Sequence, residues 1–78
     1  MSIERIRSVF SQALGLPEEF VNDQLLYSSV KAWDSVAHMA LVAALEDEFG
    51  IMLDTEDVID MSSFVIAVEI MRKHGVDT

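Results

Sequence analysis

The chain contains no cysteine among its 78 residues. This absence excludes a disulfide framework, a thiol nucleophile of its own and a thiolate metal site. Basic residues are also scarce, because five lysines and arginines stand against 14 aspartates and glutamates, which gives a formal net charge of −9. Such a charge repels phosphate backbones and anionic lipids, so we expect neither nucleic acid nor a membrane surface as a partner. A partner protein with a basic docking patch fits this charge better.

Long apolar runs are absent too, and none approaches the length of a membrane span. The segment from Met1 to Arg5 lacks the basic and apolar parts of a signal peptide, so we expect a cytoplasmic protein. A composition that is 51% hydrophobic and 24% charged is typical of a globular protein. The length suffices for one small domain, so we expect a single domain over residues 1–78, acting as a monomer.

Glycine is rare, and its positions mark the ends of the predicted helices. Gly15, Gly50 and Gly75 each follow a run of apolar residues at helical spacing, where glycine commonly ends a helix. These runs cover residues 3–14, 35–49 and 64–74. Asp54 is a candidate N-cap for a further short helix from Thr55 to about Asp60. With no strand alternation and no repeat, the sequence predicts an all-α fold, a small four-helix bundle of three long helices and one short one.

A long loop, residues 16–33, separates the first two predicted helices. It shows no sustained period, and a loop of this length in so small a domain is often functional. A short helical turn is expected at residues 17–21. The apolar side chains of the loop are expected to pin it onto the core; they are Phe20, Val21, Leu25, Leu26 and Tyr27. Trp33 is expected to anchor the loop at the edge of the bundle, with shaping of a neighbouring site as the alternative.

Asp34 and Ser35 open the second predicted helix. The carboxylate of Asp34 is suited to accept hydrogen bonds from the free N–H groups of the first turn. Ser35 would then lie in that turn with its hydroxyl directed to solvent. A helix N-terminus favours negative charge, so a phosphoryl group on Ser35 would be well placed. The alternative is that Asp34 and Ser35 only cap the helix.

The two faces of the helix predicted over residues 35–49 differ in size. At about 100° per residue, the bulky side chains fall on one face; they are His38, Leu41, Val42, Leu45 and Phe49. Small and acidic side chains occupy the opposite face and its borders. That arrangement favours a docking surface made of Val36, Met39, Ala43, Glu46 and Asp47.

Two stretches of the sequence resemble acyl carrier proteins, namely Lys31-Ala32-Trp33-Asp34-Ser35-Val36 and the run from Met39 to Ile51. The similarity extends over the helix order, the long loop and the acidic character of nearly the whole chain. It implies that Ser35 carries 4′-phosphopantetheine in a phosphodiester bond, installed from coenzyme A by a phosphopantetheinyl transferase (holo-ACP synthase). The thiol of this arm would hold acyl groups as thioesters. The chain would then be a shuttle and not an enzyme, with no catalytic residue.

The resemblance also implies partners, which are acyl-transferring, acyl-activating or condensing enzymes whose basic patches dock on the second helix. Val36 stands where the family usually has leucine, and Ala37 and Ala40 stand where members for fatty-acid synthesis tend to carry acids. These departures favour a dedicated lipid or secondary-metabolite pathway. Two alternatives stay open, an aminoacyl or peptidyl carrier of the same fold and a helical interaction module that is never modified.

The remaining polar residues offer weaker signals. A Ser35–His38 dyad would need an orienting group and an oxyanion hole, so we interpret His38 as a partly buried histidine hydrogen-bonded to the long loop. His74 is interpreted as a cation at a helix end. The acids of residues 54–60 do not form an EF-hand, because Ile59 stands where that loop needs glycine. Only loose calcium or magnesium binding is expected, at residues 46–48 or 54–60, and no dedicated metal site.

Overall fold

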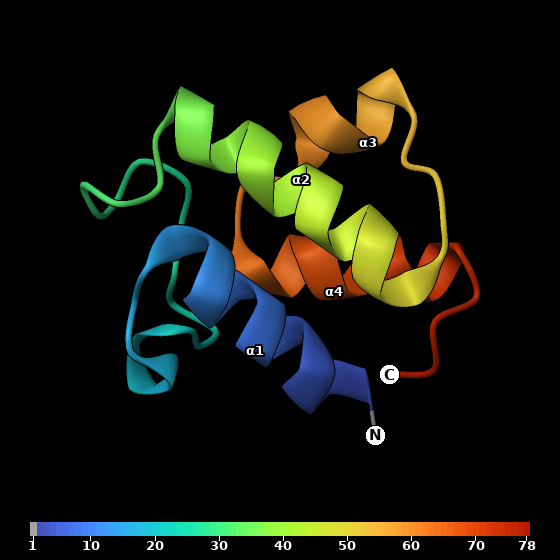
Figure 1. The fold of residues 1–78 in the computed structure, drawn as a ribbon, viewed down its shortest axis with the longest axis horizontal. Helices are drawn as coiled ribbons and strands as arrows, with labels where there is room; N and C mark the ends of the chain where they lie inside the picture. The colour runs from blue at the N-terminus through green and yellow to red at the C-terminus, as the bar shows by residue number, and fades with distance from the viewer. Residues whose placement is uncertain (1) are drawn as a thin grey trace.

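The computed structural model describes residues 2–78, so Met1, where the expected domain begins, lies outside the described residues. The described chain folds into α1 (Ser2–Leu14), a 3-10 turn η1 (Glu18–Phe20), α2 (Ser35–Phe49), α3 (Thr55–Asp60) and α4 (Phe64–Lys73) (Figure 1). The predicted all-α fold with three long helices and one short helix is confirmed. Within residues 2–78, no helix is both long and apolar enough to cross a membrane.

Short polar side chains start three of the helices, as the sequence predicts for Asp34 and Asp54. The side chains of Asp34, Asp54 and Ser63 accept hydrogen bonds from the backbone N–H groups of Ala37, Asp57 and Ile66 at 2.8, 2.9 and 3.0 Å. These contacts satisfy donors that have no partner inside a helix. At the other end of α2, Gly50 adopts φ +63° and closes the helix with its N–H bonded to the Glu46 carbonyl.

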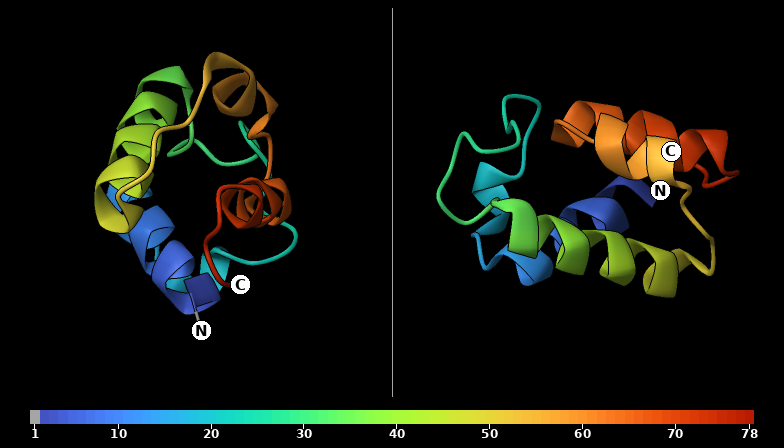
Figure 2. Two further views of the ribbon diagram at one scale, coloured as in Figure 1. Left: turned by 90° about the vertical axis from the view of Figure 1, so that its right-hand side faces the viewer. Right: turned by 90° about the horizontal axis from the view of Figure 1, so that it is seen from above.

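The helices enclose one apolar core. In the left view of Figure 2, α1 and α2 form one side of the molecule, and α3 and α4 form the other. Three aromatic rings meet edge to face at the centre, with centroid distances of 5.4 Å for Phe10–Trp33 and 5.1 Å for Phe10–Phe64. Trp33 is fully buried, so it anchors the long loop in the core itself and not at the edge of the bundle.

The long loop is fastened by backbone hydrogen bonds to the connection between α3 and α4 and to the first residue of α4. Tyr27 N–H donates to the Ser62 carbonyl at 2.8 Å, and Phe64 N–H donates to the Leu25 carbonyl at 3.1 Å. Of the five apolar side chains expected to pin the loop, Val21 and Leu25 are buried. Tyr27 is 39% exposed but packs edge to face on the buried Trp33 ring at 5.8 Å, whereas Phe20 and Leu26 are exposed, contrary to the prediction. Leu26 forms an isolated β-bridge with Ser63, and a turn follows it, closed by the Ser29 N–H bonded to the Leu26 carbonyl at 3.0 Å.

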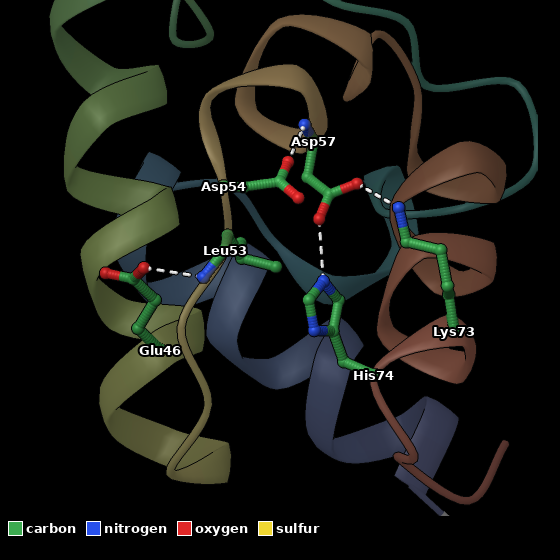
Figure 3. Close-up of polar contacts among 6 residues, drawn as sticks. All are labelled: Glu46, Leu53, Asp54, Asp57, Lys73 and His74. Carbon is green, nitrogen blue, oxygen red and sulfur yellow. Dashed lines mark hydrogen bonds and ion pairs between the residues drawn. The ribbon is translucent and has the colours of Figure 1, made fainter.

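A buried carboxylate joins α3 to the end of α4 (Figure 3). Asp57, only 2% exposed, accepts hydrogen bonds from the Lys73 ammonium and from Nε2 of His74, the latter at 2.6 Å. The hydrogen bond from Lys73 and then that from His74 lower the pKa of the Asp57 carboxyl to about 2, against the opposing effect of burial. The interpretation of His74 as only a helix-end cation is therefore wrong, because its ring is a partner of Asp57.

Candidate functional site

Ser35 is the first residue of α2 and is exposed to solvent. The residue before it, Asp34, has an extended backbone (φ −106°, ψ −172°) and caps the helix through Ala37 N–H. The long loop thus ends, and the helix begins, at this pair of residues. Within residues 2–78, the Ser35 hydroxyl makes no hydrogen bond that would commit it to a structural role.

The electrostatics at this helix end suit a negatively charged substituent. The first turn of α2 contains no acidic residue, and Lys31 lies exposed in the loop that precedes it. The free N–H groups and the dipole of a helix N-terminus stabilise negative charge by about 0.3–1 kcal/mol at exposed positions. An exposed hydroxyl at such a place fits a phosphodiester substituent, because the substituent can extend into solvent without displacing any packed side chain.

His38 lies one turn after Ser35, and both of its ring nitrogens have partners. Nε1–H of Trp33 donates to Nδ1 of His38 at 3.0 Å, and Nε2 of His38 lies 2.8 Å from the carbonyl oxygen of Val58 in α3. The predicted hydrogen bond between His38 and the long loop is confirmed. The hydrogen bond between His38 and Val58 of α3 was not predicted from the sequence. Because both nitrogens are engaged, the ring is not available to activate the Ser35 hydroxyl.

A surface pocket of about 270 Å³ lies where the long loop, α2 and α3 meet. Apolar side chains of α3 and of the residues after it make up much of its lining, and His38 forms part of the wall. The complete lining is Tyr27, His38, Val58, Ile59, Met61 and Ser62. Since His38 follows Ser35 by one turn of α2, the pocket is close enough to the serine for a group attached there to reach it.

The residues predicted to form a docking surface on α2 are not equivalent. Val36 and Met39 are 79% and 58% exposed, and Ala43 and Asp47 are also exposed. Glu46 is only partly exposed, and its Oε2 accepts a hydrogen bond from the N–H of Leu53 at 2.8 Å (Figure 3). Glu46 therefore has a structural contact that the sequence did not reveal.

Exposed apolar side chains continue beyond α2. Met52, in the segment after α2, and Ile59, in α3, are 80% and 72% exposed. Among residues 2–78, no group of three or more histidine, cysteine, aspartate or glutamate side chains lies close enough to hold a metal ion. In the acidic segment of α3, the Asp57 carboxylate is already engaged by Lys73 and His74.

The chain matches the model of a known protein family. The model of a family described as phosphopantetheine attachment site matches residues 4–68, which include all of the candidate site around Ser35. Proteins of this family bind 4′-phosphopantetheine covalently and act as non-catalytic carriers. They work with phosphopantetheinyl transferases and with enzymes that handle acyl groups.

Proposed function

Since the chain belongs to the phosphopantetheine attachment family, we propose that it is an acyl carrier protein whose Ser35 bears the phosphopantetheine arm. The chain would act as a single carrier domain. When bound, the arm supplies a terminal thiol that carries acyl groups as thioesters. The chain has no cysteine, so the thiol that the function requires would come from the cofactor.

The exposure of Ser35 at the start of α2 carries the assignment. Ser63, which precedes α4, offers a comparison, because it is 6% exposed and its Oγ accepts from Ile66 N–H at 3.0 Å. Ser63 is thus a capping serine. At α2 the neighbouring Asp34 performs the capping, which leaves the hydroxyl of Ser35 free for modification. This division of roles supports an attachment residue over the alternative in which Asp34 and Ser35 only cap the helix.

The chain's own residues would then hold and present the arm. Asp34 fixes the first turn of α2 and so positions Ser35, while the helix N-terminus stabilises the phosphodiester. The exposed part of the predicted docking surface would contact partner enzymes; it consists of Val36, Met39, Ala43 and Asp47. Charge complementarity favours partners with basic patches, because the chain carries a net charge of −9.

The partners we propose are a phosphopantetheinyl transferase and acyl-transferring, acyl-activating or condensing enzymes of a dedicated lipid or secondary-metabolite pathway. The absence of acids from the first turn of α2 supports a dedicated pathway over general fatty-acid synthesis. An aminoacyl or peptidyl carrier is the second candidate, because the same exposed serine would serve either cargo. Identifying the thioester on protein purified from its native source, by mass spectrometry, distinguishes the two cargoes.

Intact-protein mass spectrometry tests the attachment directly. The wild type, Ser35→Ala and Ser62→Ala are incubated with coenzyme A and a broad-specificity phosphopantetheinyl transferase. Ser62 is a matched control, because it is an exposed serine beside the same pocket. We expect one phosphopantetheinyl group on the wild type and on Ser62→Ala, and none on Ser35→Ala. Circular dichroism should show the same helix content in all three proteins. Loading of Ser35→Ala would contradict the assignment of the serine.

A further inference from the structure

The path from Ser35 into the core is occupied by His38. On α2, residues three or four apart share a face, so Ser35 is followed on one side of the helix by His38 and then by Leu41 and Leu45. Ser35 is exposed, whereas Leu41 and Leu45 are fully buried. The His38 ring therefore lies at the boundary between the proposed attachment residue and the apolar interior.

The partners of His38 fix its tautomer. The indole N–H of Trp33 can only donate, so Nδ1 of His38 must be the acceptor. The carbonyl of Val58 can only accept, so Nε2 must carry the proton. One neutral imidazole thus links the long loop, α2 and α3. Trp33 is fully buried, and its N–H would have no water to bond if the ring moved away.

We propose that His38 is a gate residue, one whose ring keeps the carried acyl group out of the helical core and leaves it in the surface pocket. The proposal rests on the proposed carrier function. An acyl chain entering between α2 and α3 would have to displace the ring, which would leave Trp33 N–H and the Val58 carbonyl without partners. The pocket requires no such displacement, and Val58, Ile59 and Met61 supply its apolar contacts. The cargo class that fits is a short acyl group, which has little apolar surface to bury.

The absence of cysteine allows a test that needs no transferase. In Ser35→Cys the new thiol is the only one in the chain, so it reacts selectively with n-alkyl methanethiosulfonates. The thiolate attacks the sulfenyl sulfur, a disulfide forms, and methanesulfinate leaves. Chains of four, eight and twelve carbons are attached in four backgrounds: His38 unchanged, His38→Gln, His38→Ala and His38→Leu. The melting temperature of each product is measured by circular dichroism.

A closed gate predicts that, when His38 is present, the melting temperature stops rising once the chain fills the surface pocket, so chains of eight and twelve carbons give the same value. His38→Gln should behave in the same way, because its amide offers an acceptor for Trp33 N–H and a donor for the Val58 carbonyl. In His38→Ala and His38→Leu the melting temperature should rise, by about 3–6 °C for each methylene that becomes fully buried in a domain of this size. Leucine keeps the bulk of the side chain, so it provides a folded variant if alanine leaves too large a cavity.

Two results would overturn the gate. One is a melting temperature that still rises between eight and twelve carbons while His38 is intact, and the other is the absence of such a rise in both His38→Ala and His38→Leu. Neither result depends on loading of Ser35, because the alkyl groups are attached chemically. The gain in mass with coenzyme A and transferase is measured separately on the wild type, so failure of the carrier function and failure of the gate are distinguishable.

Discussion

The carboxylate of Glu46 accepts a hydrogen bond from the backbone N–H of Leu53 at 2.8 Å, across the turn that follows α2. Leu53 is buried, and its N–H lies just before Asp54, the cap of α3. The contact therefore fixes the segment between α2 and α3 against the side of α2 (Figure 3). The next residue, Asp47, is exposed, and within residues 2–78 its side chain makes no hydrogen bond to another residue.

The sequence alone assigns Glu46 and Asp47 to the same docking surface, but their surroundings in the structure differ. Glu46→Ala should lower the free energy of unfolding by about 1–2 kcal/mol, because the Leu53 N–H loses its partner. Asp47→Ala should change it by less than about 0.5 kcal/mol. Urea unfolding followed by circular dichroism measures both. Equal losses for the two variants would show that the Glu46 contact does not stabilise the turn.

For docking of partner proteins, we expect the exposed Asp47 to matter more than Glu46. Asp47→Ala should lower kcat/KM of the phosphopantetheinyl transferase for this protein at low salt, and the difference from wild type should shrink as salt is added, since exposed charges are screened. An unchanged kcat/KM at low salt would remove Asp47 from the docking surface. Alanine at the exposed Glu69 of α4 is the control, because it removes the same charge from a different helix.

Replacement of Asp57 tests how α3 is held. Asp57→Asn keeps the size of the side chain but removes the charge that pairs with Lys73 and His74. We expect a melting temperature lower by about 5–10 °C, because charge-assisted hydrogen bonds at a buried carboxylate are lost. Asp60→Asn, an exposed change on the same helix, is the control and should have little effect. Equal melting temperatures for Asp57→Asn and the wild type would show that the cluster contributes nothing to stability.

The same carboxylate predicts how stability depends on pH. Its pKa is about 2 in the folded protein, below the ordinary 3.8, so folding favours the charged form. The stabilisation is therefore fully present above pH 3.8 and is lost as the pH falls toward 2. The difference in melting temperature between wild type and Asp57→Asn should be present at pH 5 and should shrink below about pH 4. A difference that grows as the pH falls below about 4 would contradict the sign of the pKa shift.

The features of the fold that the sequence predicted correctly depend on residues that are neighbours in the chain. Asp34, Asp54 and the glycines act on the helix ends next to them, so their roles follow from a few neighbouring residues. The buried face of α2, with Leu41 and Leu45, follows from helical periodicity alone.

The contacts that were missed join residues far apart in the chain. Asp57 lies in the first turn of α3, where any acid is favoured by the dipole, and its partners Lys73 and His74 lie at the far end of the next helix, α4. The bridge between Leu26 and Ser63 likewise joins residues far apart in the chain, and no local pattern encodes it. The attachment role of Ser35 stays a prediction, because the modification requires a transferase and the fold only leaves the hydroxyl exposed for it.

Gly50 gives a last prediction, on the end of α2. Its φ of +63° is costly for any residue with a Cβ, yet a Cβ added there would meet no atom within 4 Å apart from those of its chain neighbours. Gly50→Ala should therefore lower the free energy of unfolding by about 1–2 kcal/mol through backbone conformation alone. Gly50→Asn should lose less, although its side chain is larger, because asparagine tolerates the left-handed conformation. Urea unfolding measures both variants. A greater loss for asparagine than for alanine would mean that space, and not backbone conformation, selects glycine at this position.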